Sequence, residues 1–113
     1  MTEVAITGPI GYRRYVLEKT CESNVGHTHN YDHTTIVIRG SIRVTISKQD
    51  ADGNTVTVGS REYSAGEVVF IAANLMHTIK ALEDNSVYMC VFSHRDFDGL
   101  VTQKYVGNGA AYR

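Results

Sequence analysis

Apolar and polar residues alternate along much of the chain, and a period of two residues is typical of β-strands. The clearest example is Ser41–Lys48, where Ile42, Val44 and Ile46 share one face and polar residues occupy the other. Runs rich in β-branched and aromatic residues predict further strands. These runs are Tyr12–Thr20, Thr34–Ile38, Thr55–Val58, Val68–Ala72, His77–Leu82 and Val87–Ser93.

Turn-forming residues separate these runs at regular intervals. Asp50–Asn54 has Asp-Gly at its centre and predicts a tight hairpin, and Ser64–Glu67 and Glu83–Ser86 predict further turns. No sustained helical period occurs before His94, and beyond it only Asp96–Lys104 is compatible with a short helix. Many short strands joined by turns predict an all-β sandwich or barrel, whose mouth can bind a small ligand.

The length and charge of the chain narrow the classes of partner. A chain of 113 residues predicts one domain over residues 1–113. The net charge is −1, and Arg13 and Arg14 are the only adjacent basic pair, so we expect neither nucleic acid nor membrane as a partner. The N-terminus lacks a signal-peptide pattern, and no apolar stretch approaches the ~20 residues of a membrane span.

The number of cysteines indicates the redox state of the cellular compartment. The two cysteines, Cys21 and Cys90, do not make a disulfide framework, so a reducing cytoplasm is expected. A single Cys21–Cys90 bridge stays open as the alternative. Cys21 itself is expected to be a buried, unreactive thiol, with a place in the lining of a pocket as its alternative role.

Histidines carry the main chemical signal. His27, His29 and His33 are separated by even numbers of residues, so on an extended chain their side chains project from one face. Three converging imidazoles form an incomplete metal shell, which His77 can complete. Four buried neutral imidazoles without a metal would need many hydrogen-bond partners. The sequence therefore predicts a metal site, whereas the isolated His94 is expected to be a structural residue.

These histidines also carry a resemblance to the cupins, small jelly-roll β-barrels in which two short motifs supply a metal site. The first motif reads His-x-His, three or four residues, Glu, six residues, Gly. Here it corresponds to His27 and His29, then His33, then Gly40. His33 stands where most cupins have Glu, and Cys21 stands where the family often has Gly six residues before the first His.

The second motif reads Gly, five residues, Pro-x-Gly, two residues, His, three residues, Asn. Here Gly66 and His77 match, whereas Ala72 replaces Pro, Asn74 replaces Gly and Ala81 replaces Asn. Asn in place of Gly is a mild change because Asn tolerates positive φ. The resemblance covers roughly residues 11–93, leaving an irregular tail over residues 94–113, and it implies a cupin-type jelly-roll β-barrel.

An all-histidine site differs in charge from the usual cupin site. Three His and one Glu leave a divalent ion with a net charge of about +1, whereas four neutral His leave +2. Such an ion is a stronger Lewis acid, is harder to oxidise, and attracts an anionic or enolisable substrate. The implied cofactor is one divalent transition metal ion, namely Fe, Mn, Ni or Zn.

The resemblance implies a small-molecule enzyme of the dioxygenase or oxidative-cleavage type, because similar all-His sites occur among dioxygenases. A metal-dependent isomerase or lyase, a non-catalytic ligand- or metal-binding module, and a barrel with a purely structural metal are the alternatives. Open metal coordination at a solvent-connected pocket would favour the enzyme. The expected partner is a small-molecule substrate or ligand, and the +2 charge of the site makes an anionic molecule one candidate.

Strand parity also suggests which side chains surround the metal. Tyr31, Thr35 and Val37 share the face of His33, and Ile79 shares that of His77, so these four are expected to line the pocket. These residues include few possible general acids or bases, so any catalysis is expected to depend mainly on the metal ion.

Two surface features complete the expectations. Ile36 and Ile38 place apolar side chains on the opposite strand face, which suits the homodimer that cupins commonly form. The strand arginines are expected to be solvated, although one could meet a substrate carboxylate. These arginines are Arg13, Arg14, Arg43 and Arg61.

Overall fold

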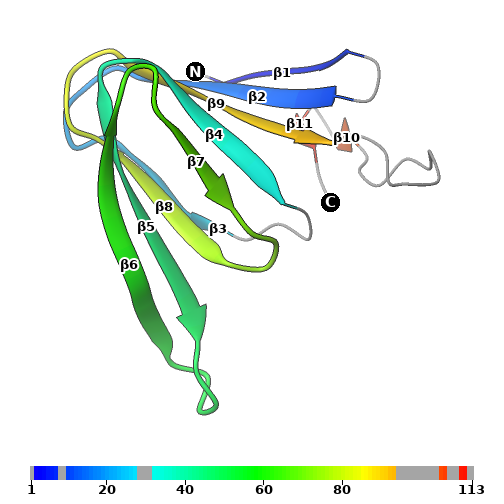
Figure 1. Cartoon of the computed structure of the whole chain (residues 1–113), viewed down its shortest axis with the longest axis vertical. Coiled ribbons are helices and arrows are strands. Elements are labelled where there is room, and N and C mark those ends of the chain that lie inside the picture. The colour runs from blue at the N-terminus through cyan, green and yellow to red at the C-terminus, as the bar shows by residue number, and fades with distance from the viewer. Residues whose placement is uncertain (1, 8–9, 28–31, 94–104, 107–109, 112–113) are drawn as a thin grey trace.

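A computed structural model describes residues 2–7, 10–27, 32–93, 105–106 and 110–111, and these form strands and turns in a jelly-roll β fold (Figure 1). The larger sheet has the order β1-β2-β9-β4-β7. Its strands are β1 (Thr2–Thr7), β2 (Ile10–Leu17), β9 (Ser86–Ser93), β4 (His33–Arg39) and β7 (Val68–Ile71). All of its pairings are antiparallel.

The smaller sheet is also antiparallel, in the order β3-β8-β5-β6. Its strands are β3 (Ser23–His27), β8 (Met76–Ala81), β5 (Ser41–Gln49) and β6 (Thr55–Ser64). A short pairing joins β10 (Tyr105–Val106) to β11 (Ala110–Ala111). No helix in the described part of the chain is long and apolar enough to cross a membrane.

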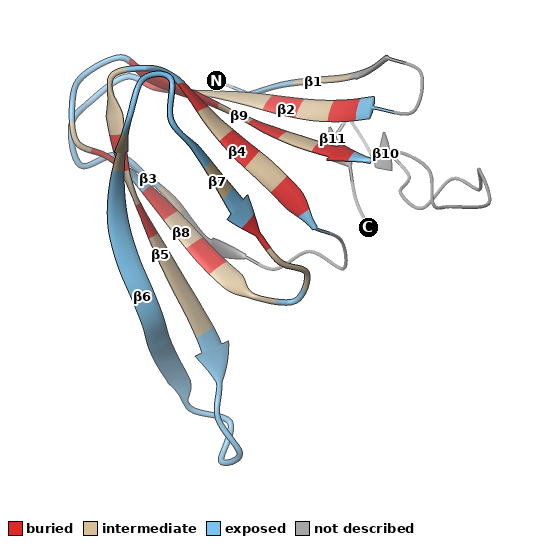
Figure 2. Cartoon of the chain, viewed as in Figure 1, coloured by how far each residue is buried: buried red, intermediate tan, exposed pale blue. Residues whose placement is uncertain are grey.

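The core lies between the two sheets, where buried residues alternate with more exposed ones along the strands (Figure 2). In β5, Ile42 and Val44 are buried, as the alternation in the sequence predicts. Their partners in the core are Leu17, Val37, Ile71, Ile79, Ala81, Tyr88 and Cys90. Strand parity therefore identifies most of the core.

Tyr88 anchors a polar and aromatic part of this core. Its ring stacks on Tyr15 with centroids 4.8 Å apart, and its hydroxyl accepts a hydrogen bond from the Asn24 side chain. Burial raises the pKa of Tyr88 and that of Tyr15. Both phenols are therefore neutral at physiological pH.

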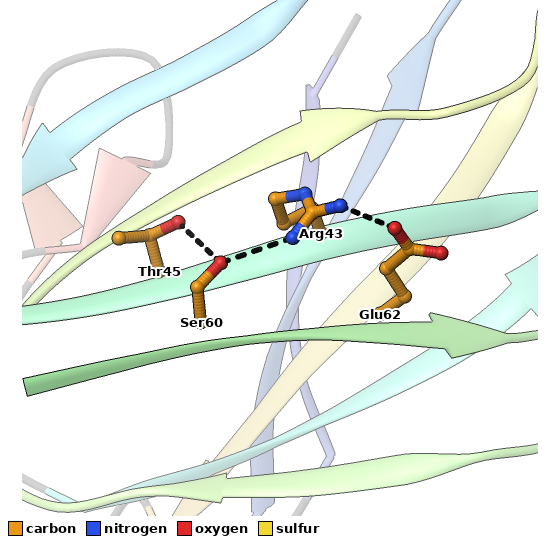
Figure 3. A network of polar contacts seen from close by, with 4 residues as sticks. All are labelled: Arg43, Thr45, Ser60 and Glu62. Carbon is orange, nitrogen blue, oxygen red and sulfur yellow. Dashed lines mark hydrogen bonds and ion pairs between the residues drawn. The ribbon is translucent and has the colours of Figure 1, made fainter.

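The outer face of the smaller sheet carries a polar network (Figure 3). Arg43 forms an ion pair with Glu62 and also donates to the Ser60 hydroxyl at 3.4 Å, which contacts the Thr45 hydroxyl at 3.2 Å. The Arg43 side chain is 42% exposed. Arg43 is thus a solvated strand-face charge, as expected from the sequence.

Most predicted strands match observed ones, but β6 is longer than predicted, and β1, β3 and the short β10 and β11 were not predicted. β6 extends to Ser64, well beyond the predicted Val58, because backbone pairing with β5 continues through a polar, exposed segment that has no apolar alternation. β1 was not predicted, because its sequence alternates only weakly. The hairpin at Asp50–Asn54 is confirmed by the 2.9 Å hydrogen bond from the Asp50 amide to the Asn54 carbonyl. Asp96–Lys104 lies outside the described residues.

The two cysteines are free thiols in different environments, so the alternative of a bridge is wrong. Cys90 is buried, whereas Cys21 is exposed, and the expectation of a buried Cys21 is also wrong. The reason is local: Cys21 lies in a surface turn with φ 72° and donates its amide to the Ala81 carbonyl at 2.9 Å. Strand parity does not extend through such a turn.

Thiol reactivity should separate these cysteines. Burial raises the pKa of the Cys90 thiol to about 11, so almost no thiolate forms there at about pH 8. We expect the native protein to show one fast-reacting thiol per chain with a disulfide reagent, and two after denaturation. Cys21→Ser should abolish the fast phase. Two fast thiols in the folded protein would contradict this assignment.

Candidate metal centre

His33 and His77 meet between the two sheets. His33 begins β4 in the larger sheet and is 3% exposed, and His77 lies in β8 of the smaller sheet and is 2% exposed. Their ring centroids are 5.0 Å apart, and the ring planes are tilted by 56°. Two imidazoles that bind one ion at ~2.1 Å in adjacent positions have centroids roughly 5 Å apart. The pair therefore fits two ligands of a single metal ion.

A backbone contact orients the His77 ring. Its Nδ1–H donates to the Leu75 carbonyl at 3.3 Å, which leaves Nε2 as the nitrogen that carries a lone pair. Asn74, which precedes Leu75, turns the chain with φ 66°. This arrangement suits a metal ligand, since ligating histidines usually donate their second nitrogen to a carbonyl or carboxylate.

Asp32 connects the two histidine-bearing segments. Its carboxylate accepts a 2.7 Å hydrogen bond from the Ala73 amide, in the loop that leads to His77. Asp32 directly precedes His33, so this bond ties the start of β4 to the β7–β8 loop. The sequence analysis assigned no role to Asp32. The signal available in the sequence was an acidic residue next to a predicted metal ligand.

Of the other two predicted ligands, the structure describes only the backbone of His27. The β3–β8 register places the backbone of His27 directly opposite His77, after an irregularity that begins at Asn24. Residues directly opposite in an antiparallel pair occupy neighbouring positions in the sheet. The His27 side chain, His29 and Tyr31 lie outside the described residues. In the described part of the chain, no group of three metal-binding side chains is found. The four-histidine shell stays a prediction.

Backbone dihedrals agree with the motif spacing. Gly40 and Gly66, the motif glycines, have φ 76° and 91°, a region that side chains rarely adopt. Asn74 and Cys21 replace motif glycines and have φ 66° and 72°. Departures from the motif therefore change the side chain at these positions and keep the left-handed backbone. Asn is suited to this conformation, whereas Cys is an uncommon occupant.

The residues expected to line a pocket lie directly below the histidines. Thr35 and Val37 follow His33 on the inner face of β4, and Ile79 follows His77 on that of β8; their exposures are 0%, 1% and 2%. Thr35 contacts the Cys90 sulfur at 3.3 Å. These side chains form the packed floor beneath the histidine pair, and a ligand contact with them stays a prediction.

A cavity of about 460 Å³ lies at the His77 end of the smaller sheet. Its lining includes Met76, which directly precedes His77, and Asn74, which forms the turn before it. Among the described residues, Lys48 and Gln49 at the end of β5 also line this cavity. None of these four residues was predicted from the sequence, because their proximity arises only from the β5–β8 pairing.

Arg13 is the main departure from the expected surface charges. It was expected to be solvated, but it is 8% exposed and lies on the inner face of the larger sheet. Its guanidinium lies 5.9 Å from the centre of the Phe92 ring and hydrogen-bonds to the Tyr15 hydroxyl. Arg13 lies four residues before the buried Leu17, so the two side chains share one face of β2. The opposite face of β2 also carries apolar residues, so alternation alone does not show which face is buried.

Comparison with solved structures supports the fold. The chain matches KdgF from Halomonas sp. with a TM-score of 0.66 and 22% identity, over 88% of this chain and 83% of that one. It matches a cupin superfamily protein from Desulfitobacterium hafniense with a TM-score of 0.63 and 12% identity, over 82% and 75%. A third match is the formate complex of oxalate decarboxylase from Lactobacillus farciminis, with a TM-score of 0.62 and 26% identity.

The match to oxalate decarboxylase involves only a part of that enzyme. It covers 80% of this chain but only 25% of that decarboxylase. No curated protein matches this chain significantly. A family model described as Cupin matches residues 23–106, which include both motif segments and therefore all four predicted ligands. The chain belongs to the cupin family.

Proposed function

We propose that this cupin is a metal-dependent enzyme that acts on a small anionic molecule, by a reaction of the dioxygenase or oxidative-cleavage type. The observation that carries the proposal is the buried His33–His77 pair, contributed by opposing sheets with centroids 5.0 Å apart. His27, His29, His33 and His77 would hold the ion. A divalent ion there supplies Lewis-acid charge and open coordination positions.

The remaining side chains support chemistry centred on the ion. Tyr88 and Cys90, which lie deep between the sheets, keep their protons at physiological pH because burial raises their pKa values. Neither therefore supplies a ready general base. What the chain contributes is orientation: the Leu75 carbonyl fixes the His77 ring, and Asp32 holds the His77 loop against the start of β4.

The name of one structural relative favours an anionic substrate. Oxalate decarboxylase acts on a dicarboxylate, and its matched structure contains formate, another carboxylate. A four-histidine shell would leave a divalent ion with its full +2 charge, which attracts such anions. We therefore propose small carboxylates or their enolisable derivatives as the substrate class.

We also propose a homodimer in the cytoplasm. The outer face of the larger sheet exposes large apolar side chains: Ile38 is 45% exposed, Val68 57% and Phe70 63%. Val68 lies beside Ile36 in the β4–β7 pairing, so these residues form a continuous apolar surface of the kind that interfaces cover. The two free thiols suit a reducing compartment.

Metal content tests the proposal first. We expect protein purified without added metal to contain about one transition metal ion per chain by elemental analysis. Dialysis from about pH 8 to 5 should release that ion steeply near pH 6, because imidazole must be neutral to bind it. Full retention at about pH 5 would show that groups other than imidazoles hold the ion.

Turnover is tested next, on the same preparation. Oxygen uptake is measured against a panel of small enolisable acids and diketones, with metal-stripped protein as the control. Metal-dependent uptake with at least one compound is expected. A protein that binds metal and carboxylates but consumes neither oxygen nor substrate would instead be a binding module.

A further inference from the structure

We propose that Lys48 binds a second carboxylate group of the substrate, in the cavity of about 460 Å³ at the end of the smaller sheet. This inference rests on the proposed function and deepens it, because it restricts the substrate to a molecule with a carboxylate at the end remote from the metal ion. Lys48 lines the cavity from the end of β5, and the proposed function assigns neither the residue nor the cavity a role.

The register of the smaller sheet places Lys48 near the candidate metal centre. Ile46 of β5 lies directly opposite His77 of β8, and Lys48 follows Ile46 by two residues in the same strand. Alternate residues of a strand share one face, so Lys48 belongs to the face that carries Ile46 and His77. Strand spacing and rise put the Cα atoms of Lys48 and His77 roughly 8 Å apart. A molecule of a few carbon atoms can span such a separation.

The cavity adjoins the segment that leads to His77. Met76 directly precedes His77, and Asn74 forms the turn before it, and both residues line the cavity. Its volume of about 460 Å³ lies within the range of pockets that bind small molecules, which is roughly 300–1,000 Å³. The cavity therefore has room for the part of a substrate that does not contact the ion.

The side chains that line the cavity suit an anionic group. Lys48 is positively charged, and the side-chain amides of Gln49 and Asn74 can each donate hydrogen bonds. Lys48 is exposed, so its ammonium group is hydrated and can exchange water for a ligand oxygen. The neighbouring Asp50 carboxylate accepts hydrogen bonds from two backbone amides of its own hairpin, both at 2.9 Å. The described lining thus contains a cation and two amide donors, and no acidic side chain.

Two positive positions would select for a substrate with two negative groups. The metal ion would bind one carboxylate, and Lys48 would bind the other with a charge-assisted hydrogen bond. A monocarboxylate can occupy only one of these positions, so it should bind more weakly than a dicarboxylate of the same length. Lys48 would therefore determine specificity and take no part in the chemical step.

Calorimetric titration of zinc-loaded protein tests this inference, with glutarate and valerate as probes. The two acids have the same number of carbon atoms, but valerate lacks the second carboxylate. We expect wild type to bind glutarate more tightly, and Lys48→Gln to weaken glutarate binding about 5- to 20-fold while valerate binding changes little. Equal affinities of wild type and Lys48→Gln for glutarate would overturn the inference, as would a wild type that does not prefer glutarate to valerate.

Lys80 supplies the matched control. It is another exposed lysine of the smaller sheet, but it pairs with Arg43 in the β5–β8 register and is absent from the described lining of the cavity. Lys80→Gln removes the same charge and should leave the preference for glutarate unchanged. An equal loss of preference in Lys80→Gln would overturn the inference, because net charge rather than the cavity would then set the preference.

Failure of the proposed function would give a different result. If elemental analysis finds no metal in the wild-type protein, the metal-dependent enzyme is excluded. The preference for glutarate over valerate can still be measured in that metal-free protein. A preference that is lost in Lys48→Gln and kept in Lys80→Gln would retain Lys48 as a carboxylate-binding residue. Metal binding without an effect of Lys48→Gln would retain the proposed function alone.

Discussion

Replacing His33 by alanine is expected to lower the affinity for the divalent metal ion by at least about 100-fold, because mutation of residues that only support a ligand already costs 10- to 100-fold. His33 is 3% exposed and faces His77 from the opposite sheet, so no solvent-exposed side chain can easily replace it. Competition titration with a chromogenic chelator measures the change. An affinity within about threefold of wild type would remove His33 from the metal shell.

Thr35→Val is the matched control for this substitution. Thr35 is the next inward residue of β4 and is fully buried, so its replacement perturbs the same surface without removing an imidazole. Metal affinity should stay close to that of wild type. If Thr35→Val also loses the metal, disturbed packing rather than loss of a ligand explains the result.

His33→Glu separates charge from ligation. Its carboxylate occupies the motif position where most cupins carry Glu, so the metal should stay bound while the net site charge falls by one unit. A bound Fe(II) should then oxidise more easily, and a small carboxylate should bind more weakly. Equal reduction potentials and equal carboxylate affinities in wild type and His33→Glu would show that His33 does not set the charge around the ion.

Gly40→Ala is expected to lower the free energy of unfolding by about 2–4 kcal/mol, through two separate effects. Gly40 has φ 76°, which costs a residue with a side chain about 1–2 kcal/mol. An added Cβ would also lie 2.4 Å from the Ser86 hydroxyl and 3.1 Å from the Ser86 Cα. Ser86 is fully buried, and its hydroxyl lies within hydrogen-bond distance of the Ser41 and Glu83 carbonyls, at 3.1 and 2.9 Å, so it cannot move cheaply.

Gly53→Ala isolates the backbone contribution. Gly53 has a similar φ of 82°, but apart from its two chain neighbours no described residue has an atom within 4 Å of the position that a Cβ would occupy. Urea denaturation of both variants should show a loss of about 1–2 kcal/mol for Gly53→Ala and a larger loss for Gly40→Ala. Equal losses would mean that the contact with Ser86 relaxes at no cost.

Much of the fold can be predicted from local pattern. The alternation in Ser41–Lys48, the Asp-Gly hairpin and the buried run before Ser93 each reflect a choice between core and solvent that is made within a few residues. The same parity places His33 and His77 on inner faces. Their meeting across two sheets follows from the second motif and not from parity, because no local pattern relates residues so distant in sequence.

The features that were not predicted depend on tertiary partners. β6 is an edge strand whose exposed residues carry no core signal, so its length is set by its neighbour β5. Arg13 is buried because Phe92 and Tyr15 cover it from neighbouring rows of the sheet. Asp32 acquires its role from a backbone amide 41 residues away. In each case the decisive contact joins distant parts of the chain.

The position of β9 in the larger sheet has a consequence for the order of folding. β9 comes after all the other strands of the two main sheets, yet it lies between β2 and β4 (Figure 1). β2 and β4 therefore have no direct pairing with each other, and β4 gains its central neighbour only when residues 86–93 are available. The part of the larger sheet that holds His33 opposite His77 therefore depends on pairing between residues far apart in the sequence. Because non-local pairing is slow to form, we expect the histidine pair to be among the last parts of the molecule to form.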